Sequence, residues 1–317
     1  MSAIIEIQGL TKQYGSLTAL QDLHLTLKQG DVFGFIGPNG AGKTTTMRIL
    51  TTLLKPTSGK AWVAGCSVLA DPRGVRRAIG YMPDFFGVYD DMKVWEYLDF
   101  FAACYDIPPQ TRGGMVDDLL ALVDLGHKKE AYVESLSRGM KQRLCLARTL
   151  THDPQVLILD EPASGLDPRA RIEMRELLRE LKNMGKTIFF SSHILSEVAD
   201  ICTSIGIIEA GRLIAHGDMA EMKRQLRAHR LIQMRVLGDP TPLQEFLLAY
   251  PGVHNIANGE ETNLPAGTIR VDFGGDDDAL SRLLADVVAQ GIQLIGFHEE
   301  TGDLEDVFLH VTQGIVN

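Results

Sequence analysis

Eight consecutive residues of the 317-residue chain could bind the phosphates of a nucleotide. They read Gly37-Pro38-Asn39-Gly40-Ala41-Gly42-Lys43-Thr44, which is the spacing of a phosphate-binding loop, or P-loop. Glycines allow backbone N–H groups to curl around the β- and γ-phosphates, and the N-terminus of the helix that should follow favours anions. Lys43 would add a positive charge on the phosphates, and the Thr44 hydroxyl would bind Mg²⁺. We place the next residue, Thr45, in the same predicted nucleotide site.

Two adjacent carboxylates could complete such a site. Asp160 and Glu161 directly follow residues 155–159, a continuous apolar run of strand length. Ligands gather at strand ends in open α/β sheets, so Asp160 is placed to serve the metal. Glu161 should point the other way, which suits it to polarise an attacking water. An acidic turn alone would be weak evidence, and it is the P-loop that makes this pair a predicted hydrolytic site.

Alternating strands and helices must position these residues. Strand candidates are residues 4–7, 31–36, 155–159 and 187–190, and helix candidates are 44–54, 91–125 (with breaks at 107–109 and 113–114) and 169–184. Helices interleaved with fully apolar strands predict an α/β fold with a mostly parallel sheet covered on both faces.

The last 90 residues differ in charge and in pattern from the rest. Residues 1–227 carry 27 Lys and Arg against 27 Asp and Glu, whereas residues 228–317 carry 4 against 14. An acidic module is repelled by phosphate backbones, so we expect no nucleic-acid partner. Strand and helix patterns in this stretch, including a last helix at 304–311, predict a small acidic α+β domain of split βαβ type.

Further motifs carry a resemblance to the ABC ATPases. Leu136-Ser137-Arg138-Gly139-Met140-Lys141-Gln142 resembles the family signature, commonly Leu-Ser-Gly-Gly-Gln. The segment Ser164-Gly165-Leu166-Asp167 resembles the D-loop, and Ser191-Ser192-His193 resembles the switch-histidine segment. Tyr14 lies where the family stacks an aromatic ring on adenine. The resemblance covers residues 4 to about 220, with the motifs in the family's order.

The resemblance implies a P-loop NTPase (RecA-like) core in residues 1–227, with an α-helical subdomain at about 88–150. It also implies a head-to-tail homodimer or heterodimer with two ATP molecules at the interface. Lys43, Thr44, Asp160, Glu161 and His193 of one subunit would face Ser137 and Gly139 of the other. In this arrangement Glu161 and His193 are the catalytic residues, His193 by sensing the γ-phosphate.

Three residues depart from the family pattern, and one of them is Met140, which replaces the glutamine of the signature. Arg138 replaces the first glycine of the signature, and it could add charge near ATP or point to solvent. Asp84, in Tyr81-Met82-Pro83-Asp84, replaces a glutamine that binds Mg²⁺ and the attacking water. A carboxylate is shorter and charged, so we expect Asp84 to reach Mg²⁺ through water. The signature keeps Ser137 and Gly139, the pair that would contact phosphate, so we expect ATP hydrolysis to survive the changes in the signature.

The resemblance to drug-export-type members, which carry a C-terminal extension, implies a role in membrane export. No apolar run approaches the roughly 20 residues that span a bilayer, and the N-terminus lacks a signal-peptide pattern. We therefore expect a cytoplasmic subunit, peripheral on the inner face of the cell membrane, docked on separate transmembrane permease subunits. Phe85 and Phe86 are docking candidates or ordinary core. The alternative is a soluble ABC ATPase acting on a non-membrane partner.

Overall fold

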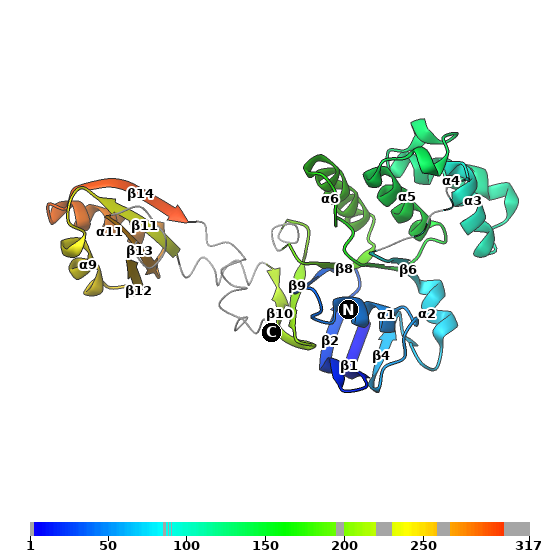
Figure 1. The fold of residues 1–317 in the computed structure, drawn as a ribbon, viewed down its shortest axis with the longest axis horizontal. Coiled ribbons are helices and arrows are strands. Elements are labelled where there is room, and N and C mark those ends of the chain that lie inside the picture. The colour runs from blue at the N-terminus through cyan, green and yellow to red at the C-terminus, as the bar shows by residue number, and fades with distance from the viewer. Residues whose placement is uncertain are drawn as a thin grey trace. The chain divides into compact units, whose positions relative to one another are not determined.

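The computed structural model describes residues 3–84, 87, 89, 91–194, 200–219, 230–258 and 267–300 (Figure 1). The chain divides into two compact units between Asp218 and Met219. Three sequence-based expectations lie outside the described residues: the domain boundary at 227, the docking candidates Phe85 and Phe86, and the last helix at 304–311.

A six-stranded, mostly parallel sheet forms the centre of the first unit (Figure 1). Its strands, in spatial order, are β10 (Arg212–Asp218), β9 (Ser204–Glu209), β3 (Val32–Ile36), β8 (Thr187–Ser192), β7 (Val156–Leu159) and β6 (Ile79–Met82). All neighbours pair in parallel except β9 with the edge strand β10. The expected α/β sheet is therefore confirmed.

The parallel strands are apolar because helices and a second sheet cover them. Every residue of β3, β7 and β8 is buried. The rings of Phe33 and Phe189 stack across neighbouring strands with centroids 5.3 Å apart, and Phe35 lies 5.4 Å from Phe189. This aromatic cluster fixes the strands whose carboxyl ends carry the P-loop and His193.

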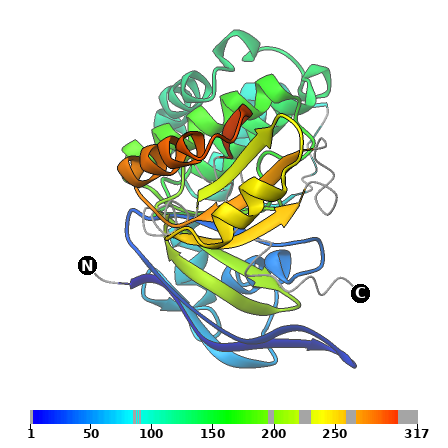
Figure 2. The ribbon, with the colours of Figure 1, turned by 90° about the vertical axis from the view of Figure 1, so that its left-hand side faces the viewer.

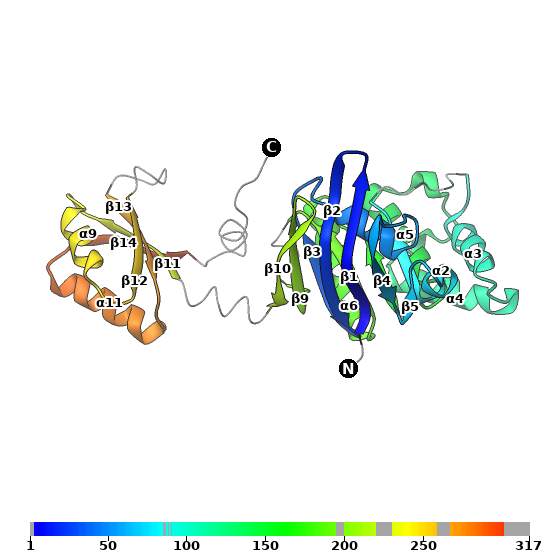
Figure 3. The same ribbon diagram turned by 90° about the horizontal axis from the view of Figure 1, so that it is seen from below.

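A second, antiparallel sheet of order β2-β1-β4-β5 packs into the same core. Its strands are β1 (Ala3–Tyr14), β2 (Leu17–Lys28), β4 (Ser58–Val63) and β5 (Cys66–Ser67). β1 and β2 form a long hairpin, the dark blue ribbon of Figures 2 and 3. Alternate leucines of β2, among them Leu23, Leu25 and Leu27, are buried. This sheet was not predicted from the sequence beyond residues 4–7.

The described residues of the first unit also form six α-helices. They are α1 (Lys43–Leu50), α2 (Pro72–Ala78), α3 (Val94–Cys104), α4 (Pro109–Leu122), α5 (Arg138–Leu150) and α6 (Pro168–Asn183). α3, α4 and α5 pack on one another at one side of the sheet (Figure 1). None of the described helices is long and apolar enough to cross a membrane.

The expected helix break at Gly113-Gly114 is wrong, because both residues lie inside α4. A glycine costs a helix roughly 1 kcal/mol relative to alanine. The buried residues Val116, Leu119 and Leu120 lie on the packed side of α4, and this tertiary burial offsets the cost. The break at 107–109 does occur, with Pro109 as the first residue of α4.

The described residues of the second unit form a four-stranded antiparallel sheet with two helices. It follows the order β11 (Arg230–Val236), α9 (Thr241–Leu248), β12 (Val253–Asn258), β13 (Thr268–Phe273), α11 (Asp277–Ala289) and β14 (Leu294–Glu300), with spatial strand order β12-β13-β11-β14. Figure 3 shows α9 and α11 on the same face of this sheet. The arrangement is the α+β, split βαβ type.

Candidate nucleotide-binding site

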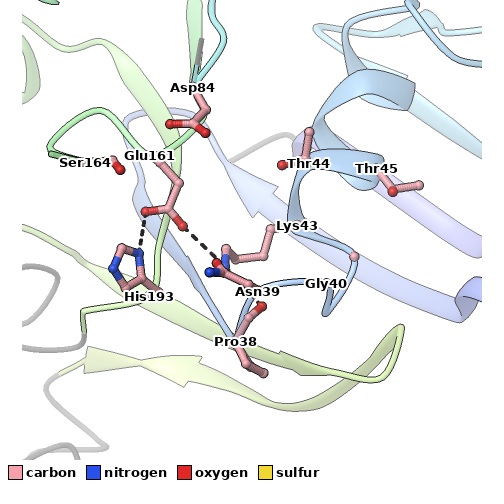
Figure 4. Close-up of a pocket in the computed structure, with 11 residues that line it drawn as sticks. Pro38, Asn39, Gly40, Lys43, Thr44, Thr45, Asp84, Glu161, Ser164 and His193 are labelled. Carbon is pink, nitrogen blue, oxygen red and sulfur yellow. Dashed lines mark hydrogen bonds and ion pairs between the residues drawn. The ribbon is translucent and has the colours of Figure 1, made fainter. Parts of the chain in front are cut away.

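The P-loop, the end of β7 and the end of β8 surround a cavity of about 270 Å³ (Figure 4). Its lining residues are Pro38, Asn39, Gly40, Gly42, Lys43, Thr44, Thr45, Asp84, Glu161, Ser164 and His193. Ten of these were predicted as site residues from the sequence. They come from four separate segments, so it is the fold of the parallel sheet that brings them together.

Glycine is required at two positions of the loop, at Gly42 by both conformation and space and at Gly37 by space alone. Gly42, directly before α1, has φ +110°, and a Cβ there would lie 2.7 Å from Leu20 Cδ2 and 2.8 Å from the Ala19 carbonyl. A Cβ on Gly37 would lie 2.2 Å from the Ile208 carbonyl. The loop is therefore pressed against the hairpin and β9, which leaves its other side to the cavity.

Lys43 places a positive charge in the cavity wall. Its side chain is 6% exposed, and Nζ donates hydrogen bonds to the carbonyls of Gly37 at 2.6 Å and Pro38 at 3.3 Å. Nζ also lies 3.3 Å from Glu161 Oε1 (Figure 4). The ammonium group is thus balanced by a carboxylate that a phosphate could replace.

Glu161 is held by three contacts in an unusual backbone conformation. Its φ is +51°, in the left-handed region, and its N–H donates to Ser191 Oγ at 2.9 Å. One carboxylate oxygen faces Lys43, and the other lies 2.8 Å from His193 Nδ1. Non-glycine residues in this region cost about 1–3 kcal/mol and cluster at functional sites. The turn directs the Glu161 side chain into the cavity, whereas the preceding residue, Asp160, lies behind the cavity wall.

Asp160 lies behind the cavity wall with one oxygen left for another ligand. Its carboxylate is buried, and Oδ1 accepts a 2.7 Å hydrogen bond from the Ser191 hydroxyl. Oδ2 is buried and has no hydrogen-bond partner among the described residues. Burial raises the pKa of Asp160, while the hydroxyls of Ser191 and Thr44 act in the opposite direction and the charge of Asp84 adds to the rise.

These oxygens fit a magnesium ion. Mg²⁺ is a hard cation that binds one or two protein carboxylates together with waters and substrate phosphates. The unpaired Oδ2 of Asp160, the neighbouring Thr44 hydroxyl and the exposed Asp84 carboxylate form such a donor set. A divalent cation would also relieve the repulsion between the Asp84 and Asp160 carboxylates.

Three predicted nucleotide-binding residues lie away from this cavity. Ser137 is exposed at the N-cap of α5, where its Oγ accepts from the Met140 N–H at 3.3 Å, and Gly139 follows in the first turn. Tyr14, at the end of β1, is 47% exposed, and Lys12 Nζ lies 5.0 Å from the centre of its ring. None of the three lines the cavity. Ala41 is buried within the loop.

Arg138 makes a contact that neither sequence-based expectation included. The side chain is exposed, but its Nη2 donates to the Ser164 carbonyl at 3.2 Å. It therefore lies against the D-loop segment of its own chain.

Two residues of the site were missed as site residues. Ser164 lines the cavity, and Ser191 joins Asp160 to the backbone of Glu161. Both stand inside motifs visible in the sequence, the D-loop segment and the segment before His193. Their position beside functional residues was the signal that could have found them.

Known proteins with a similar sequence are transporter subunits. Residues 20–164 match the ABC transporter family. The chain is 36% identical to the bacitracin transport ATP-binding protein BcrA of Bacillus licheniformis, over 99% of both chains. It is 33% identical to the Nod factor export ATP-binding protein I of Ralstonia nicotianae, over 98% of this chain and 94% of that protein. It is 29% identical to the linearmycin resistance ATP-binding protein LnrL of Bacillus subtilis, over 98% of both.

Solved structures share the fold of about 70% of the chain. An ATP-binding subunit of an ABC transporter matches 70% of this chain and 92% of its own length, with a TM-score of 0.63 and 29% identity. CbiO1 of Clostridium perfringens, part of the ABC transporter complex CbiONQ, matches 72% of this chain and 94% of its own length, with a TM-score of 0.64 and 28% identity. Together with the site geometry, these similarities show that the chain belongs to the ABC transporter family as an ATP-binding subunit, an ATPase whose hydrolysis is coupled to transport.

Proposed function

We propose that this subunit powers export through separate transmembrane permease subunits, as a head-to-tail dimer that closes around two molecules of Mg²⁺-ATP. One observation carries the proposal: Ser137 and Gly139 stand at an exposed helix N-terminus outside the cavity that Lys43 and Glu161 line. A helix N-terminus offers N–H donors and a positive dipole end to an anion. A second subunit could use it to cover the triphosphate.

Within one subunit, the loop residues would bind and orient the triphosphate. Lys43 would exchange Glu161 for phosphate oxygens, because both are anions that reach the same ammonium group. Mg²⁺ would be held by Thr44 and Asp160 and, through water, by Asp84. The bound ion would neutralise the phosphate charge. Tyr14 would stack on the adenine from the end of β1, since an exposed ring at the edge of a sheet offers a flat apolar face.

Glu161 and His193 would carry the hydrolytic step. Once Lys43 has turned to the phosphates, the Glu161 carboxylate can accept a proton from the attacking water. His193 holds this carboxylate through Nδ1 at 2.8 Å. We assign its other nitrogen, Nε2, to the γ-phosphate, so that loss of that phosphate is sensed next to the residue that activates water. The dimer can then open.

The direction of transport and the location rest on the relatives. The names of the two most similar relatives above refer to bacitracin transport and Nod factor export, and both align along nearly the full length of this chain. We therefore place this subunit at the inner face of the cell membrane, docked on permease subunits that other chains provide. The acidic C-terminal unit, domain 228–317 in the sequence-based division, argues against a nucleic-acid partner because it is repelled by phosphate backbones.

Two measurements test the proposal. Light scattering on the Glu161→Gln variant should show a monomer with Mg²⁺-ADP and a dimer with Mg²⁺-ATP. Affinity purification of the full chain from its native membranes should recover an integral membrane protein. A monomer under every nucleotide condition contradicts the head-to-tail arrangement. Recovery of ribosomes or DNA in place of a membrane protein supports the alternative, an ABC ATPase acting on a non-membrane partner.

A further inference from the structure

The first two turns of α5 hold the segment that follows Glu161 through two side chains. Arg138 Nη2 donates to the Ser164 carbonyl at 3.2 Å, and Gln142 Nε2 donates to the Pro162 carbonyl at 2.5 Å. Residues four apart lie on the same face of a helix. One face of α5 therefore binds two carbonyls of the turn formed by residues 162–165.

The guanidinium group of Arg138 covers the backbone of Gly165. A Cβ built on Gly165 would lie 2.3 Å from Nη2 and 2.4 Å from Cζ of Arg138. Gly165 also has φ +66°, in the left-handed region. Position 165 therefore favours glycine for two reasons: the backbone is in the left-handed region, and the Arg138 guanidinium leaves no space for a Cβ.

This turn reaches the catalytic cavity at its other end. The Ser164 N–H donates to the Glu161 carbonyl at 3.0 Å, and Ser164 itself lines the cavity. Figure 4 shows Ser164 next to Glu161. A displacement of the Ser164 carbonyl would therefore move a residue hydrogen-bonded to the backbone of Glu161, whose φ of +51° already depends on its surroundings.

The residues on either side of Arg138 are those that would face the partner's nucleotide. Gly139 lies against the start of α6, since a Cβ built on it would be 3.1 Å from Ala170 Cβ and 3.8 Å from Leu166 Cδ2. The start of α5, the turn and the start of α6 are in direct contact. A shift of Ser137 or Gly139 on meeting a phosphate would be passed to the turn.

We propose that Arg138 is a positioning residue that ties the signature segment to the turn that directly follows Glu161. Nucleotide bound against Ser137 and Gly139 of one subunit then sets the position of Glu161 in that same subunit, which serves the other composite site. This inference rests on the proposed head-to-tail function. It gives the two ATP sites a direct physical link and gives the arginine in the signature a role in hydrolysis.

Steady-state hydrolysis by Arg138 variants tests the tie. Arg138→Met removes the donor and keeps the stem, and Arg138→Lys keeps a cationic donor. We expect Arg138→Met to lower kcat about tenfold, the order of loss that a small misplacement of a reacting group produces, with KM for ATP changed less than about twofold. Its Hill coefficient should fall to 1 from a wild-type value above 1. Arg138→Lys should recover most of kcat. Since the side chain is exposed, Tm should shift by less than roughly 2 °C.

Two matched controls separate the tie from general effects. Arg169→Met removes an arginine on α6 that is 91% exposed, and it should leave kcat and cooperativity unchanged. Gly165→Ala should lower kcat because its Cβ displaces the guanidinium of Arg138. Gly185→Ala introduces a similar backbone strain at φ +82°, with no neighbour within 4 Å of the new Cβ, and it should not lower kcat.

Several outcomes would overturn the inference. Unchanged kcat and cooperativity in Arg138→Met would show that the contact with Ser164 has no role in hydrolysis. A tenfold rise in KM at constant kcat would show that Arg138 contacts the nucleotide directly. A wild-type protein that hydrolyses ATP without dimerising would contradict the proposed function instead. In that case, a loss of kcat in Arg138→Met that Arg138→Lys restores would still support the Arg138–Ser164 contact as a positioning contact within one subunit.

Discussion

The proposed exchange of Glu161 for phosphate at Lys43 makes the Glu161→Gln variant informative in two independent ways. The substitution keeps the shape of the side chain and removes its charge. Lys43 Nζ lies 3.3 Å from Glu161 Oε1, and the two side chains are 6% and 13% exposed. At an effective dielectric constant of about 20, this attraction is about 5 kcal/mol, and desolvation of the two charges offsets most of it.

We expect the nucleotide-free variant to lose roughly 1–3 kcal/mol of unfolding free energy, because Lys43 keeps its charge in a nearly buried place. For a unit of this size the loss corresponds to a Tm lowered by roughly 3–9 °C. Mg²⁺-ATP should abolish most of the difference, since phosphate oxygens then neutralise Lys43 in both proteins. The rate of hydrolysis should fall by about 10²–10⁴, the usual contribution of a positioned general base.

Calorimetry with and without Mg²⁺-ATP and a phosphate-release assay measure these effects. The matched control is Glu176→Gln on α6, a 60% exposed carboxylate paired with Arg179, and it should change neither Tm nor rate. The reasoning is refuted if Glu161→Gln keeps more than a tenth of the wild-type rate. It is also refuted if its Tm deficit is the same with and without Mg²⁺-ATP.

Three further predictions address the loop, the proposed stacking of Tyr14 on adenine, and the half-buried His152. Gly42→Ala should weaken ATP binding, measured by calorimetry, at least tenfold, because the new Cβ clashes with Leu20 and Ala19 and the backbone strain costs about 1–3 kcal/mol. The control is Gly40→Ala, with φ +81° and no neighbour within 4 Å of the new Cβ, which should show the effect of the strain alone. Tyr14→Ala should weaken ATP binding roughly tenfold, the order expected for one lost base stack, and Tyr14→Phe should not. Burial lowers the pKa of His152, so its neutral form is favoured in the folded state: its stabilising contribution is complete above about pH 6.5 and is lost as the pH falls below that value. The Tm of wild type should therefore drop more steeply between pH 7.5 and 5.5 than that of His152→Gln, while the exposed His24→Gln control should follow wild type.

The structure explains why His152 resists protonation. Its ring stacks on Tyr105 with centroids 3.8 Å apart, and Nε2 lies 2.8 Å from the Ile79 carbonyl, to which it donates. Nδ1 is buried without a hydrogen-bond partner in the described part of the chain. A proton on Nδ1 would bury a charged N–H with no acceptor, which is the physical cause of the lowered pKa.

Residues in contiguous motifs could be predicted from the sequence because their chemistry is local. The P-loop needs a strand, a glycine turn and a helix in succession, and Lys43 and Thr44 follow from that order alone. Glu161 could be paired with the loop because parallel strands end at the same edge of the sheet. These inferences depend on short-range pattern and on one rule of topology.

Contacts between elements could not be predicted in the same way. The Arg138 contact with Ser164 joins residues 26 positions apart and depends on how α5 packs beside the turn after β7. The long hairpin of β1 and β2 was missed although Leu23, Leu25 and Leu27 alternate with exposed residues in β2, and in β1 the repeated register shifts accompany a broken alternation of buried and exposed residues. Gly113 and Gly114 suggested a break that the packing of α4 overrides. In each case tertiary packing decided what the local pattern left open.

Complementation between two defective subunits tests the shared site most directly. In a Glu161→Gln background, add Lys43→Ala to one chain and Gly139→Asp to the other, so that each alone can build only sites with one defect. Mixing them creates one composite site in which Lys43 and the signature segment are both intact. Light scattering with Mg²⁺-ATP should show monomers for each chain alone and a dimer for the mixture. If the mixture stays monomeric while the Glu161→Gln parent dimerises, the two halves of the site do not come from different subunits.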